Sequence, residues 1–229
     1  MITLISTRRF QLRPMDFLGN GLAVMNRFCR YVRNGGMLIF ALGASLNAAA
    51  APLEQTAVFA GGCFWGVDAV FKHVKGVTDV VSGYAGGDAA TAHYEQVGTG
   101  DTGHAESVRI RFNPAQVSYQ QLLQVFFSVA HDPTQLNRQG PDVGSQYRSV
   151  IFYGSAEQQK IARSYIEQLT AARTFPAPIV TQVVPLKAFY PAEDYHQNYL
   201  ALHPNQPYIV FNDKPKLERL YRQFPALYQ

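Results

Sequence analysis

The sequence is poor in cysteine, tryptophan and charge, and each shortage limits what the protein can be. Its 229 residues include two cysteines, Cys29 and Cys63, and one tryptophan, Trp65. Paired-cysteine zinc spacings are absent, and no His-x-x-x-His pattern replaces them, so we expect no metal site and no resident cofactor. Hydrophobic residues make up 47% and charged residues 16%, which indicates a folded globular chain rather than a disordered one.

The formal net charge of +4 does not indicate a nucleic-acid-binding protein, because its positive part is confined to one end. Residues 1–50 hold six arginines and one aspartate, whereas residues 51–229 hold 14 basic and 15 acidic residues. No basic face of the folded part is therefore needed to explain the charge, and no nucleic-acid partner is expected.

Residues 1–50 have the order of a secretory leader. Three arginines at 27, 30 and 33 precede an apolar run over 37–42, and the alanines at 48–51 suit cleavage near 50 or 51. A retained membrane anchor is the alternative, but a span needs about 20 strongly apolar residues and this run weakens after Leu42. We expect a removable leader and a bacterial periplasmic protein with no stable membrane association.

The same reading of the leader fixes the cysteine content of the mature protein. The basic region before the apolar run is long, so Met25 is an alternative start of translation. Cys29 is removed with the leader in either case, and Cys63 remains alone. The mature protein can then form no internal disulfide, even in an oxidising compartment.

The mature part, taken as one domain over 51–229, shows alternating strand and helix patterns. The expected strands cover 56–60, 77–84, 105–112, 147–153 and 179–184. Expected helices start at Cys63, Ser118 and Ser155, and a short one lies within 194–203. Long loops are expected over 89–103 and 131–146. This order predicts an α+β fold, a two-layer α/β sandwich with a mixed sheet.

The segment 61–66, Gly-Gly-Cys-Phe-Trp-Gly, holds the cysteine and the tryptophan between an expected strand and an expected helix. Cys63 would lie in the first turn of that helix, where unpaired N–H groups and the dipole favour a thiolate, the nucleophilic form. The alternative is a small buried hydrophobic residue, the usual fate of a lone cysteine.

The polar residues that a thiolate site needs occur in loops or at strand ends. They are Tyr94, Glu95, Glu106, Asp142 and Tyr147. Phe64 and Trp65 could line an apolar pocket for a small alkyl group, or could simply pack in the core. A cysteine-dependent hydrolase or acyltransferase would instead pair Cys63 with a histidine base, for which five candidates exist at 93, 104, 131, 196 and 203. A non-catalytic binding module is a third reading.

Six motifs together resemble one enzyme family. They are Gly-Cys-Phe-Trp-Gly at 62–66, Gly-Tyr-Ala-Gly-Gly at 83–87, His-Tyr-Glu-Gln-Val at 93–97, Gly-His-Ala-Glu at 103–106, Asp-Val-Gly-Ser-Gln-Tyr-Arg-Ser at 142–149 and Glu-Asp-Tyr-His-Gln at 193–197. The chain resembles peptide methionine sulfoxide reductases of the A type over 55–203. The resemblance implies a ferredoxin-like core and reduction of methionine S-sulfoxide, in oxidised proteins and as the free amino acid.

The resemblance also implies roles for individual residues. Cys63 would attack the sulfoxide sulfur, and a protonated Glu106 would deliver a proton to the oxygen. Because sulfoxide oxygen leaves poorly until it is protonated, Glu106 must be buried enough to stay neutral. His196 falls in a family motif and is expected to support the site indirectly.

The same resemblance assigns the substrate-binding residues. Phe64 and Trp65 would receive the methyl group of the substrate. Tyr94 and Tyr147 would hydrogen-bond the sulfoxide oxygen, and Asp142 would help to bind the substrate through water.

The reaction leaves Cys63 as a sulfenic acid. Many family members resolve it with a second cysteine near the C-terminus, but residues 201–229 contain none. The chain therefore resembles single-cysteine members, in which an external thiol, a thioredoxin-like protein or the glutathione system reduces the enzyme. We expect a monomer.

Overall fold

The computed structural model describes residues 54–229. The predicted leader, its cleavage site, Met25 and Cys29 lie outside the described residues. Within 54–229, none of the helices combines the length and the apolar character that crossing a membrane requires.

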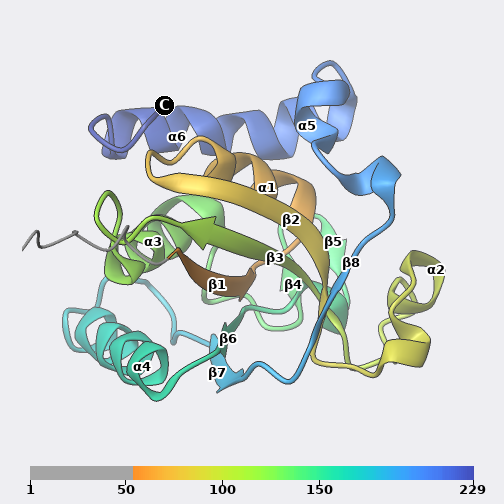
Figure 1. Cartoon of the computed structure of the whole chain (residues 1–229), viewed down its shortest axis with the longest axis horizontal. Coiled ribbons are helices and arrows are strands. Elements are labelled where there is room, and N and C mark those ends of the chain that lie inside the picture. The colour runs from red at the N-terminus through yellow and green to blue at the C-terminus, as the bar shows by residue number, and fades with distance from the viewer. Residues whose placement is uncertain (1–53) are drawn as a thin grey trace, which may run out of the picture. The chain divides into compact units, whose positions relative to one another are not determined.

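A six-stranded sheet forms the centre of the described part (Figure 1). Its strands are β1 (Gln55–Ala60), β2 (Val77–Ala85), β3 (Ala105–Phe112), β6 (Val150–Tyr153), β7 (Gln182–Pro185) and β8 (Phe189–Pro191). They are ordered β7-β6-β1-β3-β2-β8, and every neighbouring pair is antiparallel except β6 and β7. The predicted α+β class with a mixed sheet is confirmed.

Six α-helices accompany the sheet in the described residues. They are α1 (Phe64–Lys72), α2 (Tyr94–Val97), α3 (Tyr119–Val125), α4 (Ala156–Ala171), α5 (Tyr199–Leu202) and α6 (Lys214–Gln223). Helix α3 continues into a π-helical turn, η2 (Phe126–Ala130), and α6 follows a second one, η5 (Ile209–Asp213). The predicted caps are confirmed, because the side chains of Ser118 and Ser155 accept from the N–H groups of Gln121 and Gln158.

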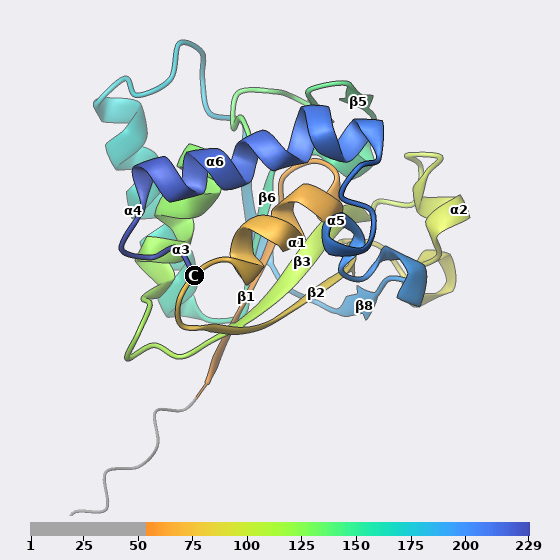
Figure 2. The same cartoon turned by 90° about the horizontal axis from the view of Figure 1, so that it is seen from above.

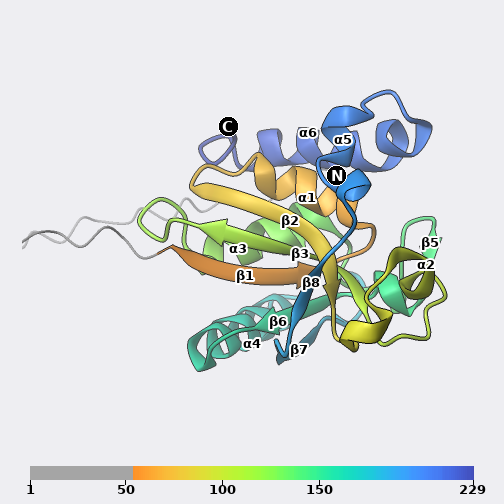
Figure 3. The same ribbon diagram turned by 45° about the vertical axis from the view of Figure 1, so that its right-hand side comes forward.

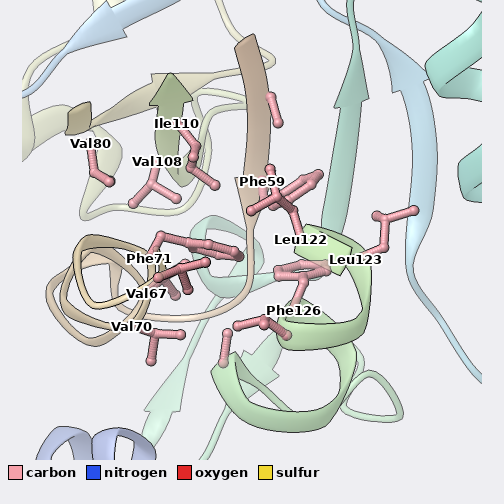
Figure 4. Packing of buried hydrophobic residues seen from close by; sticks show 14 of the residues in the cluster. Phe59, Val67, Val70, Phe71, Val80, Val108, Ile110, Leu122, Leu123 and Phe126 are labelled. Atoms are coloured by element: carbon pink, nitrogen blue, oxygen red, sulfur yellow. The ribbon is translucent and has the colours of Figure 1, made fainter. Parts of the chain in front are cut away.

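The main core lies between the sheet and helices α1 and α3 (Figure 4). Phe59 from β1 stacks on Phe126 with ring centroids 4.9 Å apart, and Phe71 from α1 lies 5.7 Å from Phe59. Residues Val108 and Ile110 of β3 face the same cluster. Since successive strand residues alternate between faces, Glu106 shares this α1-facing side of β3.

The C-terminal helix α6 was not predicted, and it adds a layer to the expected two. It lies across α1 and η2, on the side of α1 away from the sheet (Figures 1 and 2). Its apolar side chain Leu220 is fully buried in the main core cluster. The helix therefore covers the outer face of α1, for which the sequence analysis had predicted no packing partner.

Several predicted boundaries were wrong because short elements interrupt the loops. The expected loop over 89–103 contains α2, and that over 131–146 contains the two-residue strands β4 (Arg138–Gln139) and β5 (Asp142–Val143). The strand expected at 147–153 starts only at Val150, since a 3-10 turn covers Ser145–Tyr147. Strand β8 was missed, and the predicted short helix splits into a 3-10 turn, Asp194–His196, and α5.

Strand β3 was predicted to be half-buried, which was also wrong. A second apolar cluster, which includes Ala105 and Phe152, covers the sheet face opposite α1. Ser107 is 1% exposed, and Arg109 places its guanidinium 5.2 Å from the centre of the Phe189 ring. The centre of the sheet is therefore buried on both faces.

Candidate active site

The sheet register brings the cysteine motif to the start of β3. Phe59 of β1 pairs with Val108 of β3 in antiparallel fashion, so the chain that leaves β1 approaches the residues just before Val108. Gly62 turns the chain at a positive φ of 91°, and Cys63 caps α1. The backbone N–H of Phe64 donates to Oε2 of Glu106 at 3.0 Å. Phe64 and Glu106, which are 42 positions apart in sequence, are thereby neighbours.

Cys63 is buried, with 8% of its surface exposed. Burial is the main factor that raises the pKa of its thiol well above the ordinary value, and the negative charges of Glu106 and Asp213 add to it. The Trp65 backbone N–H and the charge of Lys216 act in the opposite direction. The prediction that the helix start favours a thiolate was therefore wrong for the resting site, because desolvation outweighs the amide groups.

Glu106 is buried, with 4% exposure, as the expected proton donor must be. Burial raises its pKa to about 8, the charge of Asp142 adds to this, and the hydrogen bond from Phe64 opposes it. The carboxyl group is consequently protonated at neutral pH. Because Oε2 accepts the Phe64 N–H, the other oxygen is the one free to carry the proton towards a substrate.

Tyr94 and Tyr147 lie at the same end of the sheet on adjacent segments. Figure 3 shows α2 beside β5, which immediately precedes the turn before β6. The segment that follows α2 is joined to this turn by hydrogen bonds from Gln146 Nε2 to the Gly98 carbonyl and from Ser145 Oγ to the Gly100 carbonyl. Burial raises the pKa of Tyr94 to about 12 and raises that of Tyr147 further, with the Glu106 charge as the next cause for both. Both hydroxyls therefore remain donors at neutral pH.

Asp142, in β5, is joined to the site by Tyr208, whose hydroxyl donates to its Oδ2. Burial raises the pKa of Asp142, while the Tyr208 hydrogen bond and the Lys216 charge lower it. The Tyr208 ring also meets the Trp65 indole edge-on, with centroids 5.9 Å apart. Sequence reasoning missed Tyr208, because nothing in its local pattern distinguishes it from other tail aromatics.

Trp65 is held on two sides by the segment after β8. Its Nε1–H donates to Nδ1 of His196 at 3.1 Å, and its ring stacks on Tyr199 at 3.7 Å with an interplanar angle of 6°. Since Nδ1 of His196 accepts, the neutral ring must carry its proton on Nε2. Burial lowers the pKa of His196, which favours this neutral form. Phe64 lies 5.0 Å from the same imidazole, between centroids.

Glu193 ties a second aromatic pair to this segment. Its Oε2 accepts from the Tyr84 hydroxyl at 2.8 Å and its Oε1 accepts from the Tyr94 backbone N–H at 2.9 Å. The motif at 193–197 thus holds both Trp65 and Tyr94.

Two of the five histidines that a hydrolase could use, His104 and His131, make their contacts elsewhere. His131 contacts the Phe126 carbonyl and Ser149 Oγ through its two nitrogens, at 2.9 and 2.7 Å. His104 contacts the Asp88 carbonyl and the Gly87 N–H in the same way. Within residues 54–229, no cluster of three or more His, Cys, Asp or Glu side chains is arranged to hold a metal ion.

The sequence of this chain is similar to those of known proteins. A model of the peptide methionine sulfoxide reductase family matches residues 55–227. The peptide methionine sulfoxide reductase MsrA 2 of Mesorhizobium japonicum is 61% identical over 183 residues, 80% of this chain and 94% of that protein. MsrA 2 of Synechocystis sp. is 54% identical over 170 residues, 74% of this chain and 79% of that protein.

Solved structures give the same result. Methionine sulfoxide reductase A of Corynebacterium diphtheriae superposes with a TM-score of 0.59 and 36% identity, covering 67% of this chain and 76% of that one. Reduced Mxr1 from Saccharomyces cerevisiae has a TM-score of 0.59 and 34% identity over 66% of this chain and 87% of its own. The chain belongs to the peptide methionine sulfoxide reductase family, and its activity is that of the A type, which repairs oxidised methionine.

Proposed function

We propose that Cys63 reduces methionine S-sulfoxide by direct attack of its sulfur on the sulfoxide sulfur, with Glu106 as the proton donor. The observation that carries this mechanism is the hydrogen bond between the Phe64 N–H and Glu106, which places a buried, neutral carboxylic acid beside the cysteine. A sulfoxide oxygen becomes a leaving group once it is protonated. The acid is therefore in the form the reaction needs at neutral pH.

The reaction balances with two sulfurs and one oxygen. The attack joins Cys63 Sγ to the substrate sulfur, and the sulfur–oxygen bond breaks as the oxygen takes one proton from the thiol and one from Glu106 and leaves as water. A water molecule then attacks Cys63 Sγ, which breaks the sulfur–sulfur bond and releases the thioether. The methionine sulfur gains two electrons and becomes a thioether, while the cysteine sulfur loses two and becomes a sulfenic acid. The sulfenic acid keeps one hydrogen of the attacking water, and the other returns to Glu106, which is thereby restored as the acid.

We assign the substrate contacts from the positions of the surrounding side chains. The methyl group lies against Phe64 and Trp65, whose rings the His196 segment fixes in place. The sulfoxide oxygen accepts from Tyr94 and Tyr147, both of which keep their hydroxyl protons. Asp142 contacts the rest of the substrate through water. Protein-bound and free methionine S-sulfoxide both satisfy these contacts.

We infer that an external thiol returns Cys63 to its reduced form. Cys63 is the only cysteine within residues 54–229, and its thiol is free. A thioredoxin-like protein or a glutathione-dependent reductant would attack the sulfenic acid directly and release water. This is the single-cysteine form of the enzyme.

The remaining proposals concern the whole protein. The order of basic, apolar and small residues over 1–50 supports export to the bacterial periplasm and removal of the leader. The two helices on one face of an antiparallel sheet centre support a ferredoxin-like core. We further propose that the mature enzyme acts as a monomer.

A stereochemical assay tests the proposed function. The purified protein is incubated with dithiothreitol and either dabsyl-methionine S-sulfoxide or its R epimer, and loss of oxygen is followed by chromatography. We expect turnover of the S epimer alone. Equal turnover of both epimers, or none with an intact Cys63, would contradict the proposal.

A further inference from the structure

A buried ion pair lies at the junction between η5 and α6, in the part of the chain for which the sequence predicted no element. Nζ of Lys216 is 3.1 Å from Oδ1 of Asp213, and the two residues are 8% and 0% exposed. The second carboxylate oxygen, Oδ2, is buried and has no hydrogen-bond partner in the described part of the chain. Neither residue belongs to the motifs that carry the family resemblance.

Stability alone does not explain such a pair. Removing two charges from water is costly, and apolar residues of similar volume often stabilise a protein at least as well. The orphaned Oδ2 makes the arrangement still less favourable. A buried and incompletely satisfied pair therefore points to a role for the charges themselves.

The pair packs against the first turn of the helix that Cys63 caps. A Cβ atom at Gly66 would lie 2.0 Å from Oδ1 of Asp213 and 2.6 Å from Nζ of Lys216. Only glycine leaves space for the two side chains at this position. The last residue of the 62–66 motif, to which the reaction assigns no chemical role, thus admits the ion pair.

The same C-terminal segment reaches the site at a second place. Tyr208 donates to Asp142 and contacts the edge of Trp65, one turn before Asp213. Helix α6 and η5 both pack on α1, as Figure 2 shows from above. The segment 208–216 is therefore part of the wall around Cys63 rather than a remote tail.

We propose that Asp213 and Lys216 are positioning residues that set how readily the Cys63 thiol ionises. Lys216 stabilises negative charge on the sulfur, and Asp213 limits that effect. The balance keeps the resting cysteine as a thiol, which resists adventitious oxidation, yet leaves a cation close enough to support the attacking sulfur. This role rests on the proposed function of Cys63 as the nucleophile.

Other groups also face the thiol and must be kept constant in any test. They are Glu106 from β3, Tyr94 from α2, Tyr147 from the turn before β6, and Tyr208. All of them oppose ionisation when they carry negative charge. Lys216 is the one cation among the groups that act on Cys63 in the described residues. Its removal should therefore raise the pKa of the Cys63 thiol, whereas removal of an acidic group should lower it.

The experiment measures the pH dependence of Cys63 alkylation by iodoacetamide, which requires the thiolate and no methionine sulfoxide. Its outcome is therefore independent of whether the proposed reduction occurs. We expect Lys216→Met to move the midpoint up by about one pH unit and Asp213→Asn to move it down by a similar amount. At a pH below both midpoints, alkylation would become about tenfold slower and about tenfold faster, respectively.

Two further variants separate charge from structure. Lys216→Arg keeps the positive charge and should leave the midpoint near that of the wild type. Arg222→Met removes a charge from the exposed pair with Glu218 on the same helix and should have no effect. Thermal unfolding of every variant checks that the fold is retained.

The decisive feature is the opposite sign of the two shifts, since loosened packing would move both variants in one direction. Shifts of the same sign, or no shift in folded variants, would overturn the proposal. If Lys216→Met fails to fold, the downward shift in Asp213→Asn carries the test alone. Failure of both to fold would show that the pair is structural, and would overturn the proposal as well.

Discussion

Two regions of the site differ in how they are encoded. The segment 61–66 combines paired glycines, a lone cysteine and adjacent aromatic residues. This local pattern indicates a reactive group without any knowledge of the structure. The segment 208–216 supplies Tyr208, Asp213 and Lys216 to the same site from an ordinary stretch of tail. The difference suggests that groups which react carry local signals, whereas groups which adjust them depend on tertiary contacts alone.

The first way to test this comparison is to remove the nucleophile. Cys63→Ser should reduce turnover of the S-sulfoxide to the background rate, because a hydroxyl cannot form the sulfenic acid. The measurement is oxygen loss from dabsyl-methionine S-sulfoxide with dithiothreitol. Unchanged circular dichroism would show that the fold is kept, and substantial remaining activity would place the reaction elsewhere.

The second test removes the acid. Glu106→Gln should lower the rate of sulfoxide reduction by about 10²-fold, because the amide can fill the pocket but cannot donate an acidic proton. Single-turnover assays of sulfoxide loss measure the effect. Glu157→Gln, at an exposed position on α4, is the matched control. An effect of twofold or less at Glu106 would rule it out as the acid.

The third test uses pH. The pKa of Glu106 is raised from 4.5 to about 8, so the single-turnover rate should fall by up to tenfold per pH unit above about 8 as the acid ionises. The rate of the Glu106→Gln variant should not show this decline. An identical decline in the variant would assign it to another group.

The same carboxyl group should make stability depend on pH with a defined sign. Between about pH 4.5 and 8 the unfolded chain releases the Glu106 proton while the native state keeps it. The free energy of unfolding should therefore decrease across this window, and Glu106→Gln should flatten the decrease. Urea titrations at several pH values measure the free energy of unfolding. A steeper decrease with pH in the variant than in the wild type would contradict the prediction.

The fourth test addresses the tail. Tyr208→Phe removes the hydrogen bond to Asp142 but keeps the ring against Trp65. We expect a loss of about 1 kcal/mol, or about fivefold in kcat/KM. Tyr221→Phe, at an exposed position of α6, should have no effect. Equal activity of both variants would remove Tyr208 from the site and weaken the comparison.

The smallest expected effect is spectroscopic. Trp65 is the only tryptophan, so its fluorescence reports on the bond to His196. Because burial lowers the pKa of His196, protonation of Nδ1 should break this bond only below about pH 6.5, the ordinary midpoint. The acid transition in fluorescence should vanish in His196→Gln and persist in His203→Gln. Persistence in both would assign the transition to another group.

The sequence predicted the sheet class and the helix caps for reasons that are local, whereas the approach of Cys63 to Glu106 was implied only by the resemblance to the enzyme family. Alternating residues fixed β3, and Ser118 and Ser155 marked helix starts. The protonation of Cys63 was predicted wrongly, because burial depends on every segment that covers the thiol. Helix α6 was missed because its role appears only when it covers α1, and its charged residues resemble a solvated surface.

The antiparallel register of β3 has an evolutionary consequence. Glu106 faces α1 only because it is in phase with Val108 and Ile110 on that strand. One residue inserted between 106 and 108 would turn the carboxyl group to the opposite face, beside Ala105 and Phe152, and separate it from the cysteine. An enzyme with such an insertion would therefore lose the proton donor beside its cysteine, whereas a change of length in a connection between strands would leave the phase of β3 intact.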